Sequence, residues 1–86
     1  MDVLFEIKEV TYHIVELMRR IREKYGECEL DYNYNTRAFW NYIWIKLPKE
    51  PIVRIDFPDS ELYKIGFYEV AFKKIEEMRS NHVIDE

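Results

Sequence analysis

The side chains whose spacing comes closest to a chemical site are Glu9, His13 and Glu16. They recur at i, i+4 and i+7, which places them on one polar face of a predicted helix. Imidazole and carboxylate groups suit first-row metal ions. Glu residues near His are also common on solvated helix surfaces, and the sequence assigns no further ligand. We therefore predict no metal ion and no cofactor.

Catalytic chemistry has little support elsewhere in the chain. The sequence contains no Gly-rich phosphate loop and no nucleophile motif. His82 is far from His13 in sequence, and Cys28 fits a small buried residue better than a reactive thiol. Asp31 and Asp56 would form a carboxylate pair only on neighbouring strands, and the expected strand order separates them. We predict that the protein is not an enzyme.

A second class of chemistry is aromatic contact, and it centres on the run FWNYIWIKL at residues 39–47. Successive side chains of a strand point to opposite faces of a sheet. One face of this run would carry Phe39, Asn41, Ile43, Ile45 and Leu47. The other face would carry Trp40, Tyr42, Trp44 and Lys46. Helices on one side of a sheet bury only one such face, so the run predicts a surplus apolar surface, which is typical of interaction sites. The alternative is that long neighbouring side chains, such as Lys46 and Arg54, lie over this surface.

The segments before this run read as a helix and a strand. Apolar residues at alternating spacings of three and four predict a helix over residues 3–25, with Asp2 as its N-cap and Gly26 as its stop. Apolar and polar residues then alternate over residues 28–34, which predicts a half-buried strand. A turn at residues 35–38 leads into the aromatic strand.

The segments after this run read as a third strand and a second helix. Prolines at residues 48–51 end the pairing, and residues 52–57 form the third strand. Asp59 is predicted as the N-cap of a helix that runs to about Arg79, and the tail from Ser80 is expected to fray. Gly66 within this segment either allows close packing or marks a late helix start. The inner stripe of the helix is predicted to be Leu62, Ile65, Phe72, Ile75 and Met78.

The sequence therefore predicts one α+β domain over residues 1–86, with an ordered core of about residues 3–79. Its element order is α-β-β-β-α, and short links favour a three-stranded antiparallel meander with two helices packed on one face. Double-stranded-RNA-binding domains are similar in this layout. Asp59 and Glu61, however, stand where those domains carry basic residues, so the resemblance is one of layout only.

Two registers of the first hairpin fit this pattern, and a slip of one residue exchanges the faces of the sheet. If Tyr34 pairs with Phe39, the aliphatic side chains face the helices, and Trp40, Tyr42 and Trp44 form an open stripe. If Tyr34 pairs with Trp40, the faces exchange and the aromatic side chains form the core. We favour the first register, because four-residue hairpin loops are common and this turn lacks Gly. The third strand then joins the inner face only if the second turn holds an odd number of residues.

Charge and composition exclude some classes of protein. The net charge of −4 disfavours generic binding to duplex nucleic acid. The basic cluster of Arg19, Arg20, Arg22 and Lys24 is read as a solvated helix end whose cations complement the helix dipole. Cys28 is alone, which fits a reducing compartment. No segment is apolar over a membrane-spanning length, and the first residues carry acids where a signal peptide would carry bases. We expect a cytoplasmic location, and the lack of Gln favours a thermophilic source.

These patterns predict a small acidic protein-interaction module that also self-associates as a dimer. The expected partner-binding residues are an aromatic stripe and its acidic or amide rim, namely Trp40, Tyr42, Trp44, Asp31, Glu29 and Asn33. Such a rim suits a protein partner with a basic surface. One version is a phage or viral inhibitor of the anti-restriction or anti-CRISPR type, which would block a nucleic-acid-handling protein. Two alternatives stay open: a homodimer with its function elsewhere, and binding of single-stranded nucleic acid or sugars on the stripe.

Overall fold

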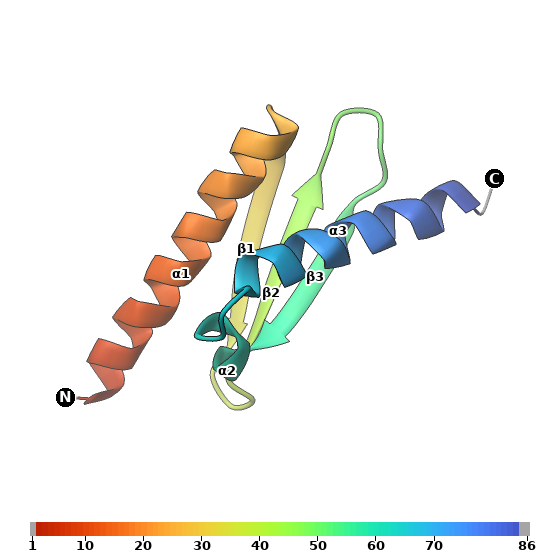
Figure 1. Cartoon of the computed structure of the whole chain (residues 1–86). Helices are drawn as coiled ribbons and strands as arrows, with labels where there is room; N and C mark the ends of the chain where they lie inside the picture. The colour runs from red at the N-terminus through yellow and green to blue at the C-terminus, as the bar shows by residue number, and fades with distance from the viewer. Residues whose placement is uncertain (1, 85–86) are drawn as a thin grey trace.

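The chain folds as a three-stranded antiparallel meander with its helices on one face (Figure 1). A computed structural model describes the backbone of residues 2–84 and the side chains of residues 12–81. The elements are α1 (Asp2–Tyr25), β1 (Glu29–Asn35), β2 (Trp40–Lys46), β3 (Val53–Pro58), α2 (Asp59–Leu62) and α3 (Phe67–Ile84). The strand order is β1-β2-β3. The predicted α+β layout is therefore confirmed.

α1 follows the predicted pattern closely. Ile14, Leu17 and Ile21 are buried on its inner side. The helix ends at Gly26, which has a φ of +78° and donates its N–H to the carbonyl of Arg22 at 2.9 Å. This left-handed Gly termination is the predicted stop. Asp2 is the first residue of α1, and its predicted capping side chain lies outside the described residues.

The second predicted helix is divided at Gly66, as the alternative of a late helix start at this residue predicted. α2 ends at Leu62 and α3 begins at Phe67, and between them Gly66 adopts a φ of +85°. The break rotates the inner stripe, so that Ile65 is fully exposed, whereas Phe67 and Ala71 are buried. α3 then continues to Ile84, beyond the predicted end.

The core lies between the inner face of the sheet and the helices. Figure 1 shows α3 crossing the sheet while α1 runs along the β1 side. The buried side chains of the strands are Ile43, Ile45, Leu47, Val53, Ile55 and Phe57. Phe67 begins α3 by placing its ring edge-on against Phe57, with centroids 4.9 Å apart. This packing makes the aliphatic side of β2 the inner side.

In the first hairpin, the aromatic side chains of β2 point outward as the favoured register predicts, but the residues that pair across β1 and β2 differ from those predicted. Tyr34 pairs with Asn41, and Asn35 pairs with Trp40. The predicted pairing of Tyr34 with Phe39 is wrong by two residues, and its pairing with Trp40 is wrong by one. The loop still has four residues, 36–39, but it lies one residue later. Because a shift of two residues keeps each side chain on its face, the aromatic stripe points outward as predicted.

The side chain of Asn35 explains where the loop begins. Its Oδ1 accepts the backbone N–H groups of Arg37 and Ala38 at 3.0 and 3.1 Å. Phe39 then adopts a φ of +53°, in the left-handed region, before β2 starts. Such an Asx-type turn keeps Asn35 in the strand. At the other end of β2, Ile45 pairs with Val53, so the connection between them consists of residues 46–52. This connection holds an odd number of residues, which is the predicted condition for the apolar side chains of β3 to join the inner face.

Asp59 is not the predicted N-cap. Pro58 occupies the cap position without a side-chain hydrogen bond. The carboxylate of Asp59 instead turns inward, where it accepts Nδ2 of Asn41 at 2.8 Å and the hydroxyl of Tyr34 at 2.6 Å. Asn41 is 0% exposed, and its Oδ1 accepts the hydroxyl of Tyr32 at 2.5 Å. This buried network ties β1, β2 and α2 together, because each buried polar group there needs a partner.

Candidate functional site

The outward side of the sheet is its aromatic side, and no element in the described part of the chain packs over it as the helices pack over the inner side. Along β1 and β2 the residues on this side are exposed or half-buried, in strict alternation with more buried ones. We call this surface the open face. It consists of Glu29, Asp31, Asn33, Trp40, Tyr42, Trp44, Lys46, Arg54 and Asp56.

The register arranges the open face in rows across the three strands. One row runs from Asp31 through Trp44 to Arg54. The next runs from Asn33 through Tyr42 to Asp56. Tyr42 and Trp44 therefore each lie between polar side chains on both edge strands, whereas Trp40 lies between Asn35 and Pro58. Directly opposed side chains of this kind interact.

The central aromatic pair is stacked. The rings of Tyr42 and Trp44 have centroids 6.1 Å apart and an interplanar angle of 28°. The guanidinium of Arg54 lies 5.6 Å from the Tyr42 centroid, and its Nη2 is 3.5 Å from Oδ2 of Asp56. The Arg54 side chain is still 55% exposed. These contacts hold the rings in a fixed arrangement while leaving the cation accessible.

Trp44 separates two open hollows. The first lies towards β1 and is lined by Asp31, Asn33 and Lys46 among others. The second lies over the β3 edge and reaches Met78 of α3. Trp44 and Ile52 line both hollows, and Ile52 is 57% exposed. The sheet therefore presents an apolar ridge with space on either side, which a complementary surface can fill.

The structure brings all six predicted partner-binding residues to the open face, but with different neighbours from those predicted. Asp31 lies beside Trp44 rather than Tyr42, and Glu29 lies beside Lys46 rather than Trp44. Asn33 lies beside Tyr42 rather than Trp40.

Arg54 and Asp56 also belong to this surface, although neither is among the predicted partner-binding residues. Their alternation with Val53, Ile55 and Phe57 carries the signal that places them outward. With Arg54 included, the rim has acids and amides along β1 and a cation on β3, so it is mixed rather than acidic.

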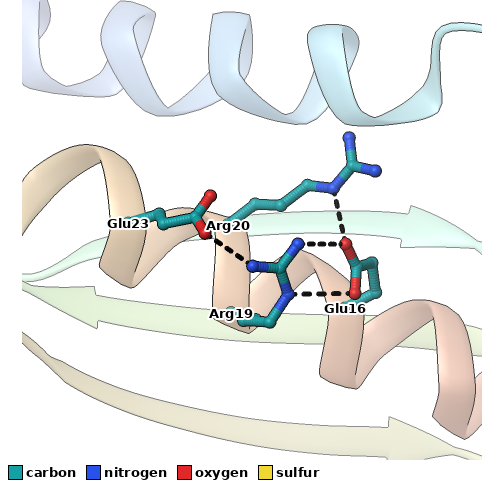
Figure 2. A network of polar contacts seen from close by, with 4 residues as sticks. All are labelled: Glu16, Arg19, Arg20 and Glu23. Atoms are coloured by element: carbon teal, nitrogen blue, oxygen red, sulfur yellow. Dashed lines mark hydrogen bonds and ion pairs between the residues drawn. The ribbon is translucent and has the colours of Figure 1, made fainter.

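Arg19 and Arg20, two of the four cations in the basic cluster on α1, are paired with acids of their own helix (Figure 2). Arg19 donates to Glu16 at 2.7 Å and to Glu23 at 2.6 Å, and Arg20 donates to Glu16 at 2.8 Å. The Arg20 guanidinium also lies 3.9 Å from the centroid of the Tyr68 ring of α3. These cations stabilise α1 and its contact with α3, and they do not form a free anion-binding patch.

The metal hypothesis gains no support. The hydrogen bonds from Arg19 and then Arg20 lower the pKa of Glu16 to about 2, so this carboxylate is already occupied. His13 packs edge-on against Tyr63 with centroids 5.2 Å apart, and the side chain of Glu9 lies outside the described residues. Within the described residues, no group of three or more His, Cys, Asp and Glu side chains is placed to hold a metal ion.

The pair Asp31 and Asp56 and the thiol of Cys28 are the other candidates for catalysis that the sequence offers. β2 lies between Asp31 and Asp56, so their strands are not neighbours. Cys28 packs against the core, and burial raises the pKa of its thiol. A raised pKa keeps the thiolate population low, which disfavours nucleophilic chemistry.

Comparisons with protein-family models, with curated proteins and with solved structures found no match to this chain. Among the helices described between residues 2 and 84, none has both the length and the apolar character needed to cross a bilayer.

Proposed function

We propose that this chain is a non-enzymatic protein-interaction module and that the open face is its binding surface. The observation that carries the proposal is the position of Trp40, Tyr42 and Trp44 on the side of the sheet opposite the buried residues of α1 and α3. A single domain of 86 residues does not need this second apolar face for its core. Trp and Tyr are the side chains most enriched at protein-interface hot spots.

The geometry favours a protein ligand over nucleic acid. Binding a phosphate backbone requires free cations beside the stacking rings. Of the two cations on the open face, Arg54 pairs with Asp56, and Nζ of Lys46 donates to the carbonyl of Leu47 at 3.0 Å. Glu29 and Asp31 line the other edge. The face is therefore apolar at its centre with a polar rim of both signs, as in protein interfaces.

We place this function in the cytoplasm, because a lone, packed Cys28 thiol is suited to a reducing compartment. An inhibitor that imitates a nucleic-acid backbone is less well supported than a general interaction module. Such a mimic needs a continuous acidic surface, whereas Arg54 and Lys46 interrupt the acids of this rim.

A photo-crosslinking side chain in place of Tyr42, in the full-length protein in its native cells, tests the proposal. We expect ultraviolet-dependent protein adducts, whose partner peptides mass spectrometry identifies. The matched control places the same group at Tyr12, which is 66% exposed on α1. Equal adducts from positions 12 and 42, or none from position 42, would contradict the proposal.

A further inference from the structure

We infer that the open face binds a second copy of this chain, with the two sheets face to face about a two-fold axis parallel to β2. This inference rests on the proposed function and adds the identity of the partner. Two features carry it: the charges on the two edge strands, and the position of the aromatic stripe on the central strand.

The two-fold operation can be followed strand by strand. A rotation of 180° about an axis parallel to β2, midway between two facing sheets, places β2 over β2 of the second copy. It also places β1 of each copy over β3 of the other, because these strands flank β2 on opposite sides. This rotation leaves the position of each residue along the strand direction unchanged. Each row of one copy therefore lies over the same row of the second copy.

The row contents are complementary under this operation. Asp31 of one copy faces Arg54 of the other, because both lie in the row of Trp44. In the next row, the amide of Asn33 faces the carboxylate of Asp56. Both contacts occur twice in the dimer, as required of an isologous interface.

The natural twist of the sheets does not destroy this match. Sheets that pack face to face are rotated by about 30° to each other. At an edge strand, about 4.8 Å from the axis, this rotation shifts a residue by about 2.5 Å. Residues of successive rows on one face are about 6.7 Å apart. The shift is less than half a row, so Arg54 stays closer to Asp31 of the second copy than to the neighbouring row.

The aromatic stripe lies on the axis. Trp44 therefore meets Trp44 of the second copy, and Tyr42 meets Tyr42, so the largest apolar groups lie at the centre of the interface. Burial at the centre and a polar rim are the arrangement that gives aromatic residues most of the binding energy.

The size of the face sets the expected affinity. Three strands of about seven residues cover a footprint of roughly 14 by 23 Å, or about 330 Å². Standard stable interfaces bury about 800 Å² on each partner. The side chains enlarge the accessible area beyond the flat footprint, and Ile52 extends it, but the face remains small. We expect a reversible dimer with a dissociation constant in the micromolar range, on the order of 1–100 μM.

The test is a charge exchange at the facing pair, followed by sedimentation equilibrium over a wide range of protein concentration. Arg54→Glu alone places like charges opposite Asp31, and Asp31→Lys alone places like charges opposite Arg54. We expect each variant to weaken the homodimer by about tenfold or more. An equimolar mixture of the two variants restores both facing pairs, so we expect a heterodimer with wild-type affinity.

Lys73→Glu is the matched control, because it changes the net charge as Arg54→Glu does but lies at an exposed position of α3. We expect it to leave the dimer unchanged. Circular dichroism establishes that each variant is folded, and restoration by mixing cannot arise from misfolded chains.

Four outcomes would overturn the inference. A dimer that resists both charge changes uses another surface. A dimer weakened by Arg54→Glu but not by Asp31→Lys has its axis across the strands, where Arg54 would face Asp56. A monomeric wild-type protein whose position 42 crosslinks to another protein refutes the second copy and leaves the proposed function intact. A monomer without crosslinks refutes both.

Discussion

Trp44 and Ile45 are neighbours in β2, and we expect their replacement by Ala to have opposite consequences. Trp44 points to the open face, and Ile45 is 0% exposed in the core. Trp44→Ala should leave the fold intact and abolish association. Ile45→Ala should destabilise the fold while leaving the open face chemically unchanged.

The magnitudes follow from the contacts of each side chain. Trp44 stacks on Tyr42, a contact worth about 0.5–1 kcal/mol. Its cross-strand pairs with Asp31 and Arg54 add about 0.2–0.5 kcal/mol each. The expected loss in the free energy of unfolding is therefore about 1–2 kcal/mol. Replacing a fully buried Ile by Ala removes apolar contacts and leaves a cavity, which costs about 2–5 kcal/mol.

Urea denaturation followed by far-ultraviolet circular dichroism measures both losses, at protein concentrations low enough to keep the chain monomeric. With a slope near 1 kcal/mol/M, Trp44→Ala should lower the urea midpoint by about 1–2 M, and Ile45→Ala by about 2–5 M. A domain of this size has a total free energy of unfolding of about 4–13 kcal/mol. The loss expected for Ile45→Ala is therefore a large share of the total. A loss for Trp44→Ala equal to or above that for Ile45→Ala would mean that the indole lies in the core, and the open face would be refuted.

Asn41→Ala should lower the free energy of unfolding by about 2–4 kcal/mol in the same assay, because it leaves buried partners in its network without hydrogen bonds; a loss below about 1 kcal/mol would refute that role. Burial, with a smaller effect of Asp59, raises the pKa of Tyr32 to about 12. Stability should therefore be complete below about pH 10 and fall as the pH rises towards 12. Tyr32→Phe should reduce this loss only in part, because the pKa values of Tyr25 and Tyr34 are also raised. Gly66→Ala should cost about 1–2 kcal/mol, because its φ of +85° disfavours a side chain while the new Cβ meets only Oε1 of Glu69 at 3.6 Å. The carboxyl resonance of Glu16 should titrate near pH 2 rather than at its ordinary 4.5; its contribution to stability is present above pH 4.5 and disappears as the pH falls through 2, and Arg19→Ala should return the midpoint towards 4.5.

Much of the fold is readable in the sequence, because local periodicity reflects which side chains must be buried. Alternation along residues 28–34 and 39–47 predicts two strands, and the stripe of α1 predicts a helix that ends at Gly26. The observation that β2 has two apolar faces also needs only the period of a strand, since Trp40, Tyr42 and Trp44 alternate with Ile43 and Ile45.

A local hydrogen-bonded turn and contacts between distant segments decided the rest. The pairing of Asp31 with Trp44 depends on where the first loop begins, which the Asn35 side chain determines through its bonds to Arg37 and Ala38. Asp59 has the composition of an N-cap, but the buried amide of Asn41 and the hydroxyl of Tyr34 draw its carboxylate inward. Hydrogen bonds between segments this far apart in sequence leave no local pattern.

The sequence by itself determined that this protein has one apolar surface more than its core requires. Only the tertiary structure decided that the aromatic side is that surface. The reason is physical: the two faces of β2 are similar in hydrophobicity, so the choice between them rests on the parity of the hairpin register and on the packing of Phe67 and its neighbours against Phe57. The same register placed Asp31 and Arg54 on opposite edges of one row, and the proposed dimer depends on that placement.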